Sequence, residues 1–384
     1  MRIAIINLTS QGISGGYKKY LLNILSYFEN DTLIDKTICA LPYVIIEKIS
    51  VMFKKVEFVK IPNYHILLNN NLHRRIYSIL DIYKPDLVFV PVERPFNYNH
   101  VPVITMLQNM EPFICPFQEN PQREKIKNLL RYITGYMAMR KADRIIAISE
   151  FVRQYLINQI GIDPAKIGLV YHGIDKPSDK TKTPEGVPVE LKSFLFTAGS
   201  IRPARGLEDI IEALGIVANK GERIPLIIAG NVEKTMIGYQ KRLQNLAQKY
   251  AVSELVHWIG HLDEEEMSWC FSNCSVFIMS SRVESFGLTA GEAMAHGAVC
   301  ISADNPCLPE IFGDAAVYYP PKNHRALAER ILEVTSWPEE KRREMSERAK
   351  KRASQFSWDI CAQKTIEQFQ IAIEEFKARK TRKG

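Results

Sequence analysis

Short apolar runs alternate with longer amphipathic segments along most of the chain, and this alternation limits the folds open to it. The first half contains the runs RIAIIN, LVFVPV, VPVITML and RIIAIS. The second half contains FLFTAG, LIIAG, LVHWIG, VFIMS and AVCIS. Strands that are apolar on both faces and are followed by helical segments are typical of parallel sheets covered by helices. We therefore expect an α/β fold with doubly wound, Rossmann-like sheets.

The spacing of these elements predicts two domains. Helices are expected at residues 16–27, 73–83, 122–141, 150–159, 206–219, 235–250, 263–272 and 288–296. A chain of 384 residues is long for one core. The polar stretch HGIDKPSDKTKTPEGVPVE, from His172 to Glu190, has no hydrophobic period and predicts a linker. We expect domains at residues 1–175 and 190–355 that face each other across a cleft.

Composition points to a cytoplasmic protein. The longest apolar runs are shorter than the roughly 18 residues that a membrane-spanning helix needs. The start of the chain, MRIAIINLTSQG, is expected to be a first strand and not a signal peptide. The seven cysteines are scattered and form no CxxC pair, which is typical of reduced, buried thiols.

The net charge of +7 is concentrated in the first half. Residues 1–175 hold 21 Lys and Arg against 15 Asp and Glu, which suggests an anionic partner for this half. The segment REKIKNLLRYITGYMAMRK (123–141) has six basic residues and one acidic residue, with apolar residues at helical spacing. Such a helix either contacts an anionic membrane peripherally or packs on its own sheet. No nucleic-acid partner is expected.

A glycine-containing loop follows the first strand in TSQGISGGYKKY. Gly12, Gly15 and Gly16 lie between a strand and a helix, where backbone N–H groups can approach a phosphate. The spacing is not GxGxxG, and no acidic residue ends a clear second strand, so a nicotinamide cofactor is disfavoured. The loop is either a phosphate site or a simple tight turn.

The second domain opens with TAGSIRPARGLEDIIEAL. Arg202 and Arg205 follow the predicted strand, and a helix begins at Gly206. Two guanidinium groups at the carboxyl end of a strand can clamp a diphosphate, because their planar forks match phosphate oxygens. Surface arginines in contact with solvent are the alternative.

Two glutamates flank a helix start in SSRVESFGLTAGEAMAHG. Backbone N–H groups at Phe286, Gly287 and Leu288 are expected to be open to a phosphate, and Gly297 is expected to cap the helix end. Glu284 could bind sugar hydroxyls, and Glu292 could bind ribose. The alternative is an acidic residue that stabilises a helix N-terminus and a second glutamate at the rim.

At this point the chain resembles a family, the retaining glycosyltransferases of family 4 (glycosyl transferases group 1), which have the two-domain GT-B fold. ESFGLTAGEAMAHG is similar to the family's Glu-x7-Glu motif, and VYHGID, LIIAGN, WIGHLDEEEMSWCFSNCSVFIMSS and FSWDICAQKTIEQF resemble its other segments. The resemblance covers residues 140–370 and is looser before that. It implies that residues 190–355 bind a nucleotide-sugar donor and residues 1–175 an acceptor, with a helix at about 357–384 that packs back on the first domain.

The resemblance also implies roles for individual residues. Ser200 stands where the family has Arg, and Arg205 where it has Lys, so that Arg202 could replace the missing cation. His261 and Leu262 match the loop that contacts the base. The implied donor site comprises Gly15, Gly16, Ser200, Arg202, Arg205, His261, Leu262, Glu284, Ser285, Phe286, Gly287, Leu288, Thr289 and Glu292.

The first domain departs from the family. Where the family often has a histidine close to the transferred sugar, this chain has Gln108 and Asn109. An amide can bind a hydroxyl but cannot shuttle a proton, which suits a mechanism in which the donor phosphate deprotonates the acceptor. The implied catalytic residues are Glu284, Arg205, Arg202, Asn109 and Gln108, whereas His172 is expected to be a hinge residue.

The resemblance thus implies a hexosyltransferase that moves a sugar from a UDP- or GDP-sugar, with retention, to a saccharide or lipid-linked saccharide, in the assembly of bacterial surface polysaccharide or glycolipid. No cofactor is expected, and no metal, because the sequence has no Asp-x-Asp to hold one on the diphosphate. A sugar-nucleotide epimerase of the same fold and a non-catalytic nucleotide-sugar binding subunit are the alternatives. A phosphorylase is disfavoured by the chain length and by the absence of an evident lysine-bearing cofactor loop.

Overall fold

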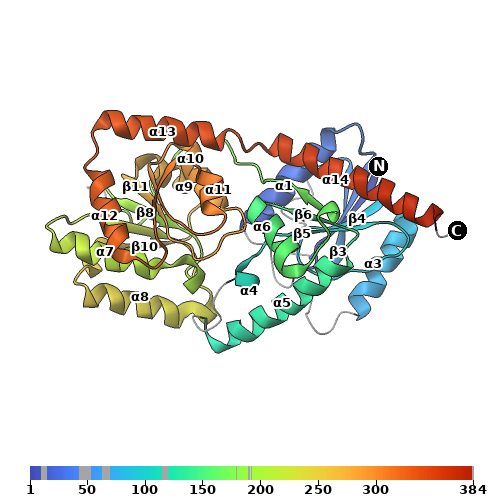
Figure 1. The fold of residues 1–384 in the computed structure, drawn as a ribbon, viewed down its shortest axis with the longest axis horizontal. Helices are drawn as coiled ribbons and strands as arrows, with labels where there is room; N and C mark the ends of the chain where they lie inside the picture. The colour runs from blue at the N-terminus through green and yellow to red at the C-terminus, as the bar shows by residue number, and fades with distance from the viewer. Residues whose placement is uncertain are drawn as a thin grey trace. The chain divides into compact units, whose positions relative to one another are not determined.

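The computed structural model describes residues 1–9, 15–42, 53–62, 70–114, 120–178, 180–188, 191 and 193–382. Gly12 and Cys115 lie outside these ranges. The chain divides into two compact units (Figure 1). Unit 1 comprises Met1–Pro112, Asn128–Gly173 and Ser357–Gly384, and unit 2 comprises Phe113–Lys127 and Ile174–Phe356. Each unit has its own parallel sheet, so the predicted fold class is confirmed.

Unit 1 is built on a seven-stranded sheet in the order β3-β2-β1-β4-β5-β6-β7. Its strands are β1 (Arg2–Ile6), β2 (Lys36–Pro42), β3 (Val56–Ile61), β4 (Leu87–Val90), β5 (Val103–Leu107), β6 (Arg144–Ala147) and β7 (Ile167–Leu169). Its helices include α1 (Gly15–Asn30), α3 (Asn70–Tyr83), α6 (Glu150–Tyr155) and α14 (Trp358–Thr381). The short α4 (Glu111–Ile114) begins in unit 1 and ends in unit 2, while α5 (Gln122–Lys141) begins in unit 2 and ends in unit 1.

The closing helix α14 is part of the unit 1 core. Phe369 of α14 packs against Phe89 of β4 and Phe28 of α1, with ring centroids 5.1 and 6.1 Å apart. Arg144 of β6 donates to Gln368 of α14 at 2.7 Å, which adds a polar contact at the sheet. The chain therefore completes unit 1 only with its last helix.

Unit 2 has a six-stranded sheet in the order β10-β9-β8-β11-β12-β13. Its strands are β8 (Leu195–Ala198), β9 (Leu226–Ala229), β10 (Val256–Gly260), β11 (Val276–Met279), β12 (Cys300–Ala303) and β13 (Ala316–Tyr319). Its helices include α7 (Leu207–Asn219), α8 (Ile237–Lys249), α9 (Glu264–Asn273), α10 (Leu288–Ala295), α11 (Leu308–Phe312), α12 (His324–Thr335) and α13 (Glu339–Ala353). Aliphatic residues of β8, β9, β11 and β12 form one core with α7, α8 and α12.

The chain passes between the units at both ends of the segment Phe113–Lys127, at Gly173 and at Ser357. The segments that cross at Gly173 and at Ser357 lie side by side, because the Ile174 N–H donates to the Phe356 carbonyl at 2.9 Å. Gly173 also lies so close to Trp358 that an added Cβ would stand 2.3 Å from the Trp358 backbone nitrogen. The described residues from 172 to 188 contain no helix or strand.

In the described part of the chain, no helix is both long enough and apolar enough to cross a membrane.

Candidate active site

The strand order of unit 2 brings two loops together at the carboxyl edge of the sheet. β8 pairs with β9 on one side and with β11 on the other, so the strand order reverses at β8. Ligands of open α/β sheets bind at such a reversal. The loops that follow β8 and β11 border a small pocket there, which is lined by Thr197, Ala198, Gly199, Arg205, Leu207, Ile228, Ala229, Met279, Ser280 and Ser281.

The turn after β8 depends on two glycines. Gly199 has φ +143°, and an added Cβ would lie 2.9 Å from Arg205 Nε. Gly206 has φ +62°, and an added Cβ would lie 2.4 Å from the Ser280 carbonyl oxygen. Both positions thus require the left-handed backbone and the close approach that only glycine tolerates. This geometry lets Arg205 lie over Gly199 and brings the turn against the loop after β11.

Arg205 and Glu284 form an ion pair at this edge. The Arg205 guanidinium also donates to Ser281 Oγ at 3.2 Å, and the Ser280 hydroxyl donates to the Arg205 carbonyl at 2.7 Å. The side chains of Arg205 and Glu284 are 25% and 14% exposed, so both remain accessible. The pair offers a fork for phosphate oxygens next to an acceptor for hydroxyl groups.

Arg202 does not join this pair. Its guanidinium donates to Glu233, in the segment after β9, at 2.9 Å. Ser200 lies earlier in the same turn and is half-buried. The two arginines that the sequence suggested as one clamp therefore hold different carboxylates in this structure.

The start of α10 is open. Gly287 is its N-cap, with φ +86°, and no side chain caps the helix. The first N–H groups of an α-helix, here from Leu288 and Thr289 onward, have no partner within the helix. Ser285 and Phe286 are buried, and Phe286 packs edge-on against Phe356 with centroids 5.4 Å apart. The loop is thus anchored while the helix end is left for an anion.

Glu292 lies in the second turn of α10 and is half-buried. Because α10 begins at Leu288, the path from Glu284 to Glu292 is a loop followed by helix and not one continuous helix. Gly297 has φ +73° and its N–H donates to the Met294 carbonyl at 2.9 Å, which confirms the predicted glycine cap.

The loop after β12 also reaches this site, and the sequence analysis missed it. Asn305 Nδ2 donates to the Ser281 carbonyl at 2.6 Å. Cys307 has φ +76°, which is unusual for a residue with a side chain. Burial and the nearby carboxylates of Glu284 and Glu310 raise the pKa of the Cys307 thiol, so it stays protonated. Only a fold prediction that placed this loop beside β11 could have found these residues.

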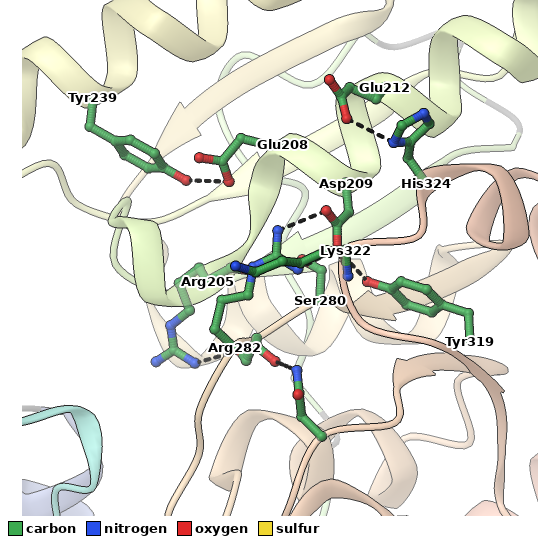
Figure 2. A network of polar contacts seen from close by, with 12 residues as sticks. Arg205, Glu208, Asp209, Glu212, Tyr239, Ser280, Arg282, Tyr319, Lys322 and His324 are labelled. Carbon is green, nitrogen blue, oxygen red and sulfur yellow. Dashed lines mark hydrogen bonds and ion pairs between the residues drawn. The ribbon is translucent and has the colours of Figure 1, made fainter. Parts of the chain in front are cut away.

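A buried carboxylate, Asp209, binds Arg282 of the loop that carries Glu284 (Figure 2). Asp209, in the first turn of α7, forms a two-bond ion pair with Arg282 at 2.5 and 2.7 Å. The Tyr319 hydroxyl donates to Asp209 at 3.4 Å, and the Lys322 N–H does so at 3.1 Å. Burial disfavours the charged guanidinium, but hydrogen bonds and the charge of Asp209 outweigh it and raise the pKa of Arg282. The sequence analysis did not single out either residue.

The segment after β10 begins with His261, which is exposed, and Leu262, which is buried. Asp263 then starts α9 with a capping box, in which its carboxylate accepts from the Glu266 N–H at 2.9 Å. The backbone of this segment is thus fixed by a helix cap directly after the two residues predicted to contact a base.

In unit 1, Gln108 and Asn109 follow β5. The Glu93 carboxylate accepts the backbone N–H groups of both residues, at 2.6 and 2.5 Å. Gln108 Nε2 donates to the Pro91 carbonyl at 3.0 Å, and Asn109 Oδ1 accepts from the Glu111 N–H at 3.0 Å. Both amides therefore hold their own loop, and Glu93, which the sequence analysis missed, organises it from the segment after β4.

The two glycines of the first loop stand at the start of α1. Gly15 is exposed, with nothing within 4 Å of an added Cβ, and Gly16 is half-buried. The open surroundings of Gly15 fit either interpretation of this loop.

His172 is enclosed by aromatic rings. Its ring centroid lies 5.0 Å from Tyr20 and 5.9 Å from Trp358. Burial lowers the pKa of His172 to about 3, so the imidazole is neutral at physiological pH. A neutral, enclosed ring next to the crossing at Gly173 fits a structural role better than a catalytic one.

Among the described residues, no three His, Cys, Asp or Glu side chains are grouped so that they could hold a metal ion.

Family models match both parts of the chain. Residues 179–352 match the model described as glycosyl transferases group 1, and residues 42–176 match glycosyltransferase family 4. A curated relative, the D-inositol 3-phosphate glycosyltransferase of Mycobacterium tuberculosis, is 26% identical over 266 residues. That match covers 66% of this chain and 54% of the relative, so the chain spans about half the length of the curated relatives it matches.

Solved structures show the same architecture. Anabaena Alr3699/HepE, in complex with UDP and glucose, matches with a TM-score of 0.72 and 18% identity, over 96% of this chain and 98% of that one. WaaG, a glycosyltransferase involved in lipopolysaccharide biosynthesis, matches with a TM-score of 0.71 and 14% identity, over 96% and 99%. Together with the family models, these matches confirm the resemblance seen in the Glu-x7-Glu segment: the chain belongs to the group 1, family 4 glycosyltransferases of the GT-B fold.

Proposed function

We propose that this protein transfers a sugar from a nucleotide-diphosphate sugar to a hydroxyl group, with retention of configuration. The observation that carries the proposal is the Arg205–Glu284 pair beside the uncapped start of α10, at the strand reversal of unit 2. This arrangement combines one cation, one open helix N-terminus and one hydroxyl acceptor. A sugar diphosphate presents the complementary groups.

Each group has a place in the reaction. The Arg205 guanidinium and the N–H groups at Leu288 and Thr289 stabilise the charge that develops on the departing diphosphate, which we expect to supply most of the rate. Glu284 accepts hydrogen bonds from the hydroxyls of the transferred sugar. Glu292 holds the ribose, and the backbone after Gly260 meets the base. The donor phosphate takes the acceptor proton, because neither Gln108 nor Asn109 can do so.

The donor that we favour is a UDP-sugar, with a GDP-sugar as the second choice. The HepE complex with UDP supports a uridine nucleotide in this fold. We propose a saccharide or lipid-linked saccharide acceptor and a role in bacterial surface polysaccharide or glycolipid assembly, which the lipopolysaccharide role of WaaG supports. No cofactor or metal takes part in this proposal.

A panel of UDP-, GDP- and ADP-sugars in a thermal-shift assay tests the donor site, because only a true donor should stabilise the protein strongly. Analysis of products with and without an acceptor then separates the alternatives. Conversion of free sugar nucleotide into an epimer would replace transfer by epimerisation. Binding without any hydrolysis or transfer would mean a non-catalytic subunit.

We further propose that α5 places the protein at the cytoplasmic face of an anionic membrane. Four apolar side chains at helical spacing are exposed on α5, namely Ile126, Leu129, Ile133 and Met137, with exposures of 61, 51, 46 and 41%. Basic residues from Arg123 to Lys141 accompany them. An exposed apolar stripe with basic neighbours fits an anionic lipid surface.

Sedimentation with phosphatidylglycerol vesicles tests this location. The wild type should pellet at low salt and less at high salt, and Ile126→Ser with Ile133→Ser should stay in the supernatant. Ile82→Ser on α3, a residue 84% exposed outside the stripe, is the matched control. Equal recovery of the wild type in the supernatant at both salt concentrations would remove the membrane proposal but would leave the transfer reaction standing.

A further inference from the structure

The Asp209–Arg282 pair connects the loop of Glu284 to the rest of unit 2 (Figure 2). Arg282 lies two residues before Glu284, and its side chain is 9% exposed. Asp209, with a side chain 4% exposed, accepts from both nitrogens of the Arg282 fork. One carboxylate therefore ties the loop after β11 to the first turn of α7.

Arg282 is held at its backbone as well as at its side chain. Its N–H donates to the Ala204 carbonyl at 2.7 Å, in the turn that carries Arg205. The guanidinium lies over Gly206, where an added Cβ would stand 3.0 Å from Arg282 Cζ. Through Arg282, the loop of Glu284 is thus fixed on both sides of Gly206, to the Ala204 carbonyl before it and to Asp209 after it.

Asp209 is itself fixed from another strand. The Tyr319 hydroxyl at the end of β13 and the Lys322 N–H donate to the Oδ2 atom that also accepts from Arg282. The carboxylate consequently joins three segments that are far apart in the sequence. None of the four bonds to Asp209 involves a residue to which the proposed function assigns a ligand contact. The bonds can therefore affect the donor site through the position of Glu284.

We propose that Asp209 and Arg282 are positioning residues that set the place of the Glu284 carboxylate relative to the Arg205 guanidinium. Without the pair, the segment directly before Glu284 is held by the Ala204 carbonyl and by the hydroxyls and carbonyls of Ser280 and Ser281, while the segment after Glu284 is held by the packing of Phe286 on Phe356. Buried and bidentate, the pair gives the loop one geometry, whereas a single-point contact would allow several. This inference rests on the proposed donor-site function of Glu284.

Arg282→Lys is the test variant, because lysine keeps the charge but cannot form the fork. The control is Arg342→Lys in α13, where Arg342 donates to the carbonyls of Val334 and of Ser275, the residue before β11 and thus at the other end of that strand from Arg282. Asp209→Asn is a second variant, but it leaves the Arg282 charge buried without its counter-ion and can fail to fold.

Hydrogen exchange of the ligand-free proteins gives the first readout. Peptides that cover 280–287 should exchange faster in Arg282→Lys than in the wild type, while peptides from α12 should be unchanged. Arg342→Lys should leave 280–287 as in the wild type. Unchanged exchange at 280–287 in Arg282→Lys would overturn the proposal, whatever the donor proves to be.

Kinetics with UDP-glucose and GDP-mannose as probes give the second readout. Since a misplacement of about 1 Å can cost about a hundredfold in rate, Arg282→Lys should lower kcat for probe hydrolysis by about tenfold or more. The KM for the probe and the affinity for bare UDP should change by less than about threefold, because the phosphate contacts remain. A general loss of structure would instead move binding, kcat and Tm together.

The outcomes separate this proposal from the proposed function. A wild type that neither binds nor hydrolyses any probe would defeat the function, while the exchange experiment would still show whether the pair holds the loop. A wild type that turns over and an Arg282→Lys variant with wild-type kcat would defeat the positioning role alone.

Discussion

The two glutamates of the Glu-x7-Glu motif have different surroundings, so their neutral variants should affect different steps of the reaction. Glu284 pairs with Arg205 in the loop, whereas Glu292 lies in the second turn of α10. Glu284→Gln should lower kcat greatly with little loss of donor binding, because alignment of the sugar matters most in the transition state. Glu292→Gln should weaken the binding of donor and bare nucleotide together. A lost charged hydrogen bond costs about 1.5–3 kcal/mol, so each effect should reach about tenfold or more.

Calorimetry with the bare nucleotide diphosphate separates the two roles, because that ligand lacks the sugar. If Glu284→Gln weakens it as much as Glu292→Gln does, the division between sugar and ribose is wrong.

His172 should make the protein sensitive to acid. Burial lowers its pKa in the folded protein to about 3, whereas an unfolded histidine titrates near 6.5. The unfolded chain therefore binds the proton first as the pH falls. The stability that this neutral ring provides is complete above about pH 6.5 and is lost between about pH 6.5 and 3, by up to about 1.4 kcal/mol per pH unit.

Thermal melts of the wild type and of His172→Phe between pH 8 and pH 5 measure this effect. The phenylalanine keeps an aromatic ring between Tyr20 and Trp358 but cannot titrate, so its Tm should fall less on the acid side. Parallel curves for the two proteins would show that His172 does not contribute to the acid sensitivity.

At the scale of a helix, α10 packs closely against its neighbour at a glycine, Gly291. An added Cβ at Gly291 would lie 2.4 Å from Ile174 Cδ1, so Gly291→Ala overpacks the contact between α10 and the segment after the crossing. The expected cost is about 1–3 kcal/mol of unfolding free energy. Gly238→Ala in α8 is the control, since nothing lies within 4 Å of its added Cβ and alanine favours helix by up to about 1 kcal/mol. Urea titrations should show a lower unfolding free energy for Gly291→Ala and an unchanged or higher one for Gly238→Ala.

Strands that are buried at every residue were predicted, whereas β2, β3, β7 and β13 were missed. β4, β5, β8 and β11 are buried at every residue, so their sequences have a continuous apolar signature. β3 lies at the edge of its sheet and exposes Glu57, and β2 begins with an exposed Lys36 and ends in Pro42. The mixed sequence of β3 has neither a clear period nor a continuous apolar run, and β2 has only the short run ICAL between a Lys-Thr start and a proline. Both strands were missed.

The candidate site divides in a similar way. Arg205 and Glu284 belong to local motifs, so their sequence context was enough to select them. Glu93, Asp209 and Asn305 act on loops that follow other strands, and nothing adjacent in the sequence marks them. Which loops meet is decided by strand order, and that order is a property of the folded sheet. Residues that support a site from a neighbouring strand were therefore out of reach of sequence analysis.

For the molecule as a whole, we expect turnover without a divalent metal. The proposed site places a guanidinium and an open helix end where other sugar-transfer enzymes use a carboxylate-bound cation. Activity on the true donor should persist in excess EDTA. Complete loss of activity, restored by magnesium or manganese, would mean that the diphosphate site has been misassigned.

The last helix has a consequence for how the chain is made. α14 supplies Phe369 to the core of unit 1, yet the ribosome synthesises it after all of unit 2. Residues 174–356 hold a complete six-stranded sheet and can fold as they emerge from the ribosome. The first 173 residues, by contrast, keep an apolar face uncovered until α14, which ends at residue 381, has been synthesised. During synthesis the order of folding should therefore be the reverse of the order of the sequence. A chain truncated before α14 should bind chaperones through residues 1–173, which are synthesised first.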